Sequence, residues 1–157
     1  MSGVGPGRAA VPSQVKGAPA VLALRALGLG DALTGVPALR GLRRAHPGHR
    51  LVLAAPAGPG GWLRDLGVVD AVLPASGVRA LEPLDTALVE EVLGGPPDVA
   101  VNLHGRGPQS HRVLAATGPR RLVGFACTGF PGGPAWEGDE HEVQRWCRLV
   151  REATGGS

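Results

Sequence analysis

The sequence predicts an α/β fold with a Rossmann-like, doubly wound and mainly parallel sheet of about five or more strands. Short apolar runs alternate with segments in which apolar residues recur at helical spacing. The apolar runs lack the polar alternation of half-exposed strands, which indicates strands covered by helices on both faces. The 26 glycines and 15 prolines fall mostly between these segments, where they end elements.

The first predicted strand is the apolar run 21–24, and a glycine-rich turn and Asp31 follow it. An aspartate after such a turn is typical of a helix N-cap. The helix that follows has apolar residues at helical spacing and ends at 46–48, a His-Pro-Gly sequence. Pro37 lies inside this pattern, so the helix either kinks there or restarts with Pro37 in its first turn.

The same patterns predict the remaining elements. The apolar runs are read as strands at 50–56, 68–74, 98–103 and 121–126. Helical spacing, ended by glycine or proline, predicts helices at 62–66, 84–93, 109–117 and 139–153. Gly and Pro clusters predict loops at 58–61 and 131–138.

The length of 157 residues suits one ordinary domain. We expect a disordered leader at 1–19, a single domain at 20–153 and a short tail at 154–157. The leader lacks the apolar core of a secretory signal, and no apolar run reaches the roughly 18 residues that span a bilayer. These features predict a cytoplasmic location.

The composition argues against a nucleic-acid partner. The net charge is only +3, and the arginine-rich, isoleucine-free composition is typical of a G+C-rich genome. Arg40, Arg43 and Arg44 form the one dense basic cluster, which is either a solvated helix face or a phosphate contact. Cys127 and Cys147 fit no zinc-binding spacing, so we expect two buried free thiols and no metal site.

Ligands of such sheets bind at the carboxyl ends of the strands, which singles out 28–34 and 102–110. The turn at 28–31 begins like a dinucleotide fingerprint, but Leu33 stands where the last glycine is needed, and no Walker lysine follows. Its backbone amides could still approach an anion. Asp31 is either a helix cap or a carboxylate that accepts a proton from a substrate hydroxyl.

The segment 102–110 is the most polar in the chain. Its amide, imidazole, guanidinium and hydroxyl groups suit a polyhydroxylated or phosphorylated ligand. The alternative is a surface loop in which Ser110 caps the next helix. The candidate ligand-binding side chains are Asn102, His104, Arg106, Gln109 and Ser110.

The helix after Asp139 begins like a zinc-protease motif, but Arg145 stands where the second histidine is required, which excludes that motif. His141 is interpreted as structural, and Trp146 and Cys147 as packing residues.

Three segments together resemble family 9 glycosyltransferases, the heptosyltransferase-like enzymes. In 27–44 a Gly-Asp pair precedes a helix with Pro37-Ala38-Leu39 and a basic end, and 46–48 continues the similarity. The segment 98–110 looks like the family's fourth strand and acceptor-side loop. The segment 141–150 looks like the helix that closes its first domain.

The resemblance implies the N-terminal half of a GT-B architecture, in which this domain holds the acceptor and a second domain holds a nucleotide sugar. Asp31 would be the general base that deprotonates the acceptor hydroxyl for an inverting transfer of a heptose or hexose. No metal or cofactor is implied. The acceptor-side residues would be Gly30, Thr34, Asn102, His104, Arg106, Gln109 and Ser110.

The chain ends where that second domain should begin, so we expect no efficient transfer by these residues alone. The donor domain would come from a longer polypeptide or from a partner. The acceptor would be a saccharide or glycolipid of the cell envelope, and a lipid-linked acceptor would bring the protein to the inner face of the membrane. The alternatives are a non-catalytic Rossmann-like binding module, a partner-dependent short homologue, and a nucleotide-binding domain that uses 28–31.

Overall fold

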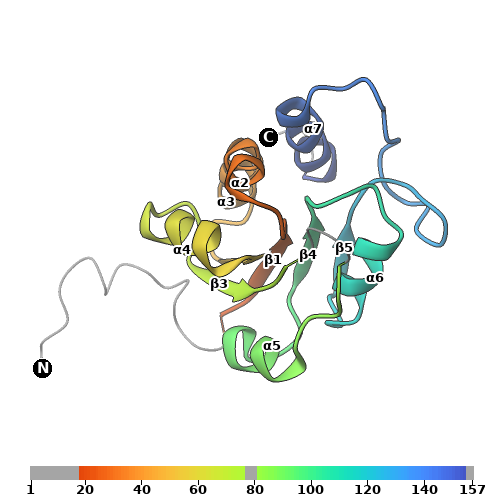
Figure 1. Cartoon of the computed structure of the whole chain (residues 1–157). Coiled ribbons are helices and arrows are strands. Elements are labelled where there is room, and N and C mark those ends of the chain that lie inside the picture. Colours follow the sequence, from red (N-terminus) through yellow and green to blue (C-terminus); the bar gives the residue numbers. More distant parts are fainter. Residues whose placement is uncertain (1–17, 77–80, 155–157) are drawn as a thin grey trace, which may run out of the picture.

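The computed structural model describes residues 18–76 and 81–154 of the 157-residue chain. Most of the predicted leader and tail therefore lies outside the described residues. Five parallel strands form one sheet in the order β3-β2-β1-β4-β5, with helices around it (Figure 1). The strands are β1 (Ala20–Leu24), β2 (Arg50–Ala55), β3 (Ala71–Pro74), β4 (Val99–Asn102) and β5 (Arg121–Val123).

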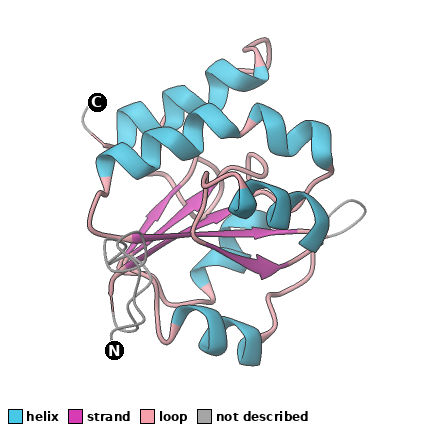
Figure 2. Cartoon of the chain, turned by 90° about the vertical axis from the view of Figure 1, so that its left-hand side faces the viewer, coloured by secondary structure: helices cyan, strands magenta, loops and turns pink. Residues whose placement is uncertain are grey.

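Helices cover both faces of the sheet (Figure 2). One face packs against α2 (Leu29–Thr34), α3 (Val36–Ala45), α4 (Ala57–Asp65) and α7 (Glu142–Ala153). The other packs against α5 (Thr86–Leu93) and α6 (Gln109–Ala115). The predicted α/β class with a doubly wound parallel sheet is therefore confirmed.

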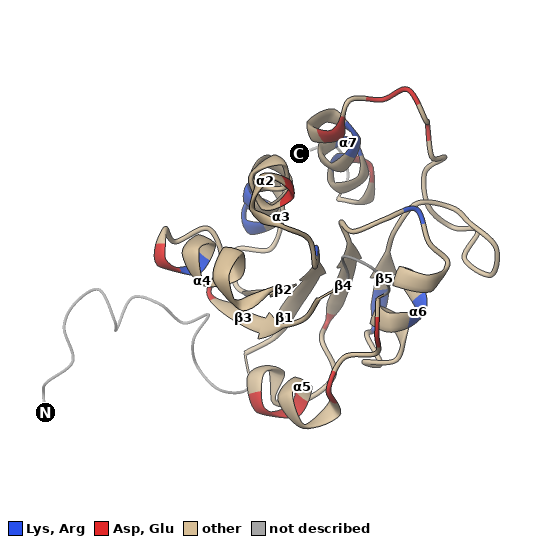
Figure 3. Cartoon of the chain, in the orientation of Figure 1, with Lys and Arg blue, Asp and Glu red and all other residues tan. Residues whose placement is uncertain are grey.

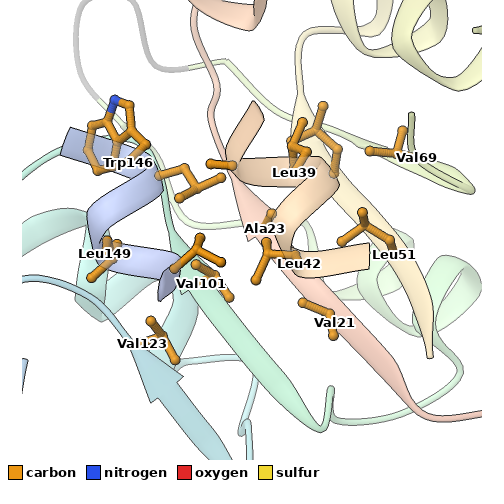
Figure 4. Packing of buried hydrophobic residues seen from close by; sticks show 14 of the residues in the cluster. Val21, Ala23, Leu39, Leu42, Leu51, Val69, Val101, Val123, Trp146 and Leu149 are labelled. Atoms are coloured by element: carbon orange, nitrogen blue, oxygen red, sulfur yellow. The ribbon is translucent and has the colours of Figure 1, made fainter. Parts of the chain in front are cut away.

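The central strand β1 contributes alternate side chains to the two cores. Val21 and Ala23 face the α3 and α7 side, where Leu39, Leu42 and Trp146 pack over the sheet (Figure 4). Leu22 and Leu24 face the α5 and α6 side instead. Burial on both faces explains why the strand sequences show no polar alternation.

The first helical pattern forms two helices. They meet at Gly35, and α3 restarts with Pro37 in its first turn, as one of the two sequence interpretations expected. A Cβ at Gly35 would lie 2.7 Å from Cδ of Arg25. The break therefore lets the backbone pass directly over a buried arginine.

The predicted loop at 58–61 is wrong, because these residues belong to α4, which begins at Ala57 rather than at Trp62. A Cβ at Gly60 would lie 2.7 Å from a methyl carbon of Val72. Glycine here allows the helix to lie close to β3, a packing reason that composition does not reveal. Three other elements are shorter than predicted, because β3 begins at Ala71, β5 ends at Val123 and α7 begins at Glu142.

Charged residues lie mostly on the helices and loops (Figure 3). In the cluster of Arg40, Arg43 and Arg44, Arg43 is not free, because its guanidinium pairs with Asp70 at 2.7 Å. Cys127 and Cys147 are free thiols, as expected, but both are only partly buried. Every helix in the described part of the chain is too short or too polar to cross a bilayer.

Candidate functional site

The candidate site lies where the strand order reverses, between β1 and β4. Leu24 and Asn102, the last residues of these strands, are partners in register. Beyond them the amide of Leu103 donates to the carbonyl of Leu24 at 3.0 Å, and the amide of Ala26 donates to Nδ1 of His104 at 3.1 Å. The ends of β1 and β4, which lead into the predicted ligand-binding segments 28–34 and 102–110, therefore meet. This is the usual ligand-binding position of such sheets.

Arg25 follows β1 directly and is only 2% exposed, although it carries a charge. Its guanidinium donates to the backbone carbonyls of Asp31 and Leu103 and, at 2.9 Å, to the hydroxyl of Thr34. It also lies over the ring of Trp146, 5.3 Å from the ring centroid. One side chain thus joins α2, the loop after β4 and α7 at the switch point.

Asp31 does not cap a helix. The N-cap of α2 is Gly28, and Asp31 lies inside the first turn, so the cap interpretation is wrong. Its side chain is 54% exposed, and one carboxylate oxygen lies 3.8 Å from a guanidinium nitrogen of Arg25. Among the described residues, no side chain or amide donates a hydrogen bond to this carboxylate. It is therefore open to a ligand.

Thr34 and Gly30 lie on the same short helix. The Thr34 hydroxyl donates to the Asp31 carbonyl at 2.9 Å and accepts from Arg25, so its hydrogen bonds stabilise the turn that carries Asp31. Gly30 is exposed, and a Cβ there would meet no atom within 4 Å. The backbone is thus accessible beside Asp31.

Asn102 and Ser110 lie beneath the polar loop. Asn102 is fully buried, and its side-chain oxygen accepts from the amides of His104 and Gly105 at 2.8 and 3.2 Å. Its amide nitrogen contacts Ser110 Oγ at 2.7 Å and Nδ1 of His111 at 2.8 Å. Ser110 therefore does not cap α6, whose N-cap is Pro108. This network fixes the shape of the loop from below.

His104 is half-buried beside Arg25. Because its Nδ1 accepts from the Ala26 amide, its ring proton is assigned to Nε2. Burial, reinforced by the positive charge of Arg25, lowers the pKa of His104 below its ordinary value, although the charge of Asp31 opposes this. The lowered pKa favours the neutral ring at pH 7, with its Nε2–H as a donor.

The two remaining predicted side chains are more exposed. The guanidinium of Arg106 stacks 5.5 Å from the ring centroid of Trp136. Gln109 donates to the carbonyl of Leu81 at 2.9 Å. Whether either contacts a ligand stays a prediction.

Sequence reasoning missed Glu142, the first residue of α7. One of its carboxylate oxygens accepts from the indole of Trp146 at 3.0 Å and lies 3.5 Å from Arg25, and the other pairs with Arg145. Burial raises the pKa of Glu142, but the indole hydrogen bond and the charges of Arg145 and Arg25 outweigh it, so the net shift is downward. No local sequence pattern pointed to this network, because Glu142 and Arg25 are 117 positions apart.

Other features lie apart from this site. A pocket of about 500 Å³ follows the free edge of β5, and its lining includes His111, Arg121, Phe130 and Glu152 but none of the predicted site residues. Within the described ranges, no group of three or more His, Cys, Asp or Glu side chains is arranged to hold a metal ion. His141 is the N-cap of α7, where its ring accepts from the Val143 amide at 3.3 Å.

Neither a family model nor a curated protein sequence matches the chain. Several solved structures match the chain. Escherichia coli heptosyltransferase WaaC with ADP matches 87% of this chain and 47% of its own, with a TM-score of 0.66 at 20% identity. A family 9 glycosyltransferase from Veillonella parvula DSM 2008 matches 88% of this chain and 42% of its own, with a TM-score of 0.66 at 15% identity.

A third similar structure is the E. coli ADP-heptose lps heptosyltransferase II, with 83% of this chain and 40% of its own covered, a TM-score of 0.59 and 20% identity. The chain thus spans less than half the length of these enzymes. At these identities the likeness establishes the fold. The structural resemblance to the heptosyltransferase-like enzymes is confirmed at that level.

Proposed function

We propose that this chain is the acceptor-binding half of an inverting glycosyltransferase, with Asp31 as the general base. The supporting observation is the Asp31 carboxylate, which is half-exposed at the switch point and accepts no hydrogen bond from a side chain or amide of the described residues. It occurs on a fold like that of heptosyltransferases, one of which was solved with ADP-2-deoxy-2-fluoro heptose. The substrate class is then a heptose or hexose on a nucleotide, transferred to a saccharide or glycolipid hydroxyl.

In the proposed reaction, Asp31 accepts the proton of the acceptor hydroxyl as that oxygen attacks the anomeric carbon. The bond from this carbon to the diphosphate breaks, and its electron pair leaves with the nucleoside diphosphate. The configuration inverts in a single displacement. Arg25 holds the backbone carbonyl of Asp31, so it fixes the turn that presents the base.

The acceptor-side residues divide into two groups. Gly30, His104, Arg106 and Gln109 are at least partly exposed around the polar edge and are proposed to contact the acceptor. Asn102, Ser110 and Thr34 hydrogen bond within the protein and are proposed to hold these groups in place.

The nucleotide-sugar site is proposed to come from a further domain of the polypeptide or from a partner, because the chain spans under half of the similar enzymes. We place the reaction in the cytoplasm, in cell-envelope glycan synthesis. A glycolipid acceptor would draw the protein to the inner membrane face, where exposed Arg40 and Arg44 could contact anionic headgroups.

The alternatives are a non-catalytic binding module and a nucleotide-binding domain that uses the open turn at 28–31. Binding calorimetry on the purified chain separates the nucleotide-binding alternative from the proposal, and the transfer assay with Asp31→Asn separates the non-catalytic module. We expect binding of methyl glycosides of hexoses or heptoses and no heat with ADP, UDP or NAD. The Asp31→Asn variant should bind saccharide more weakly, with exposed Asp65→Asn as the matched control. Binding of nucleotides without any binding of saccharides would overturn the acceptor-half assignment.

A further inference from the structure

Two half-exposed carboxylates flank the same buried guanidinium. An Asp31 oxygen lies 3.8 Å and a Glu142 oxygen 3.5 Å from one terminal nitrogen of Arg25. The side chain of Glu142 is 44% exposed and that of Asp31 is 54% exposed, whereas Arg25 is buried. Both carboxylates therefore lie beside the same guanidinium nitrogen, although they are far apart in the sequence.

Glu142 suits hydrogen bonding rather than proton transfer. The indole of Trp146 and the guanidinium of Arg25 donate to one of its oxygens, and Arg145 donates to the other, which keeps accepting capacity for one more donor. Because its net pKa shift is downward, the group stays ionised at neutral pH. Among the described residues, no donor holds the Asp31 carboxylate in this way, so it is open to a substrate hydroxyl. The two carboxylates therefore differ in chemistry at one site.

The charges of the side chains in this cluster sum to zero. Arg25 and Arg145 oppose Asp31 and Glu142, and His104 adds a neutral N–H donor beside Arg25. Arg145 is more than nine-tenths buried, and its Nε–H finds no hydrogen-bond partner among the described residues. The cluster thus offers carboxylate acceptors and the His104 Nε2–H donor without net charge. A neutral polyol fits this set better than a phosphate or a metal cation does.

We propose that Glu142 is a second acceptor-binding residue, which takes one hydroxyl of the acceptor sugar while Asp31 takes the reacting hydroxyl. This inference rests on the proposed function. Arg25 acts as a positioning residue that holds both carboxylates at one spacing. The acceptor would then be a ring with two hydroxyls close enough to bridge them, and it would carry no phosphate at those positions.

Trp146 provides a direct reporter, because its indole N–H donates to Glu142. The chain has three tryptophans, so the indole region of a ¹⁵N–¹H spectrum holds few signals. Methyl glycosides of hexoses and of a heptose are titrated at millimolar concentration into the labelled chain. We expect saturable shifts of the Trp146 indole and of amides next to Asp31, with one common Kd. The indole of exposed Trp62, on α4, should not move.

The variant Glu142→Gln should weaken saccharide binding about tenfold, the size expected for a hydrogen bond to a charged group. The matched control is Glu91→Gln, an exposed glutamate on α5. If saccharides shift the amides near Asp31 while the Trp146 indole and the Kd of Glu142→Gln stay unchanged, this inference fails and the proposed function stands. If no saccharide shifts either set of signals, both fail. The wild-type indole titration decides the case even if Glu142→Gln does not fold.

Discussion

Arg25 shows how one buried charge can organise a site. Burying an unpaired guanidinium is costly, so its N–H donors must find partners. Here they find two backbone carbonyls, a threonine hydroxyl and the Glu142 carboxylate, and the Asp31 carboxylate lies 3.8 Å from the same guanidinium. The strong acceptors are contributed by three separate segments, so forming this network brings α2, α7 and the loop after β4 together. The proposed base is thereby placed by the same contacts that complete the fold.

The buried histidines make stability depend on pH. Burial lowers the pKa of His111, outweighing the hydrogen bond to the Phe125 carbonyl, and the pKa of His104 is also lowered. Because the unfolded chain then binds more protons, the free energy of unfolding falls as pH drops below about 6.5. Urea unfolding should therefore give a lower free energy of unfolding at pH 5 than at pH 7.

His111→Gln should make this pH dependence shallower, because protonated His111 would oppose the donor of Asn102. Exposed His141→Gln should keep the wild-type slope. A free energy of unfolding that stays constant between pH 7 and pH 5 would contradict neutral, buried histidines.

Asp98 affects stability in a lower pH range. Hydrogen bonds from Arg120 and His49 lower its pKa to about 2, so the stability that the ionised Asp98 contributes is lost only as pH falls below about 4.

At this scale the sequence placed Asp31 and the segment 102–110 at the correct edge, because strand ends and glycines mark that edge. The interpretation of Asp31 as a helix N-cap was wrong, because α2 begins before Asp31, with Gly28 as its N-cap. Glu142 could not be found in advance. It meets Arg25 across 117 positions of sequence, and no local pattern records such a contact.

Among the elements, α4 shows where composition misleads. Its sequence of glycines and a proline is typical of a loop, yet it forms a helix over β2 and β3. The reason is close packing: Gly60 lies against Val72 and Ala55, where any side chain would collide. Strands were easier to predict, because continuous apolar runs between turns have few other stable arrangements.

Two of the three glycines of α4, Gly58 and Gly60, allow a matched test. Gly60→Ala should lower the free energy of unfolding by roughly 1 to 3 kcal/mol, because its Cβ overlaps Val72. Gly58→Ala, where a Cβ meets no atom within 4 Å, should raise it by up to about 1 kcal/mol. Equilibrium urea unfolding measures both. Equal changes in the free energy of unfolding for the two variants would show that packing against β3 is not the reason for glycine at position 60.

For the whole molecule, sheet order and site position follow from one another. The chain builds β1, β2 and β3 outward in one direction and then returns to place β4 on the other side of β1. That return opens the sheet's carboxyl edge between β1 and β4, where Asp31 and His104 lie. The fold resembles less than half of the similar heptosyltransferase structures. In the proposed function, the nucleotide sugar is therefore bound by residues outside this chain.

The most direct test of the account replaces Asp31 by Asn in the chromosomal copy of the source cells. The tagged protein is purified with everything that stays bound to it, and sugar transfer from labelled nucleotide sugars to glycolipid is measured. Because a positioned base contributes at least about a hundredfold to rate, wild-type material should transfer sugar and the variant should be slower by that factor or more. Equal transfer by the two proteins, with equal folding, would contradict the assignment of Asp31 as the base.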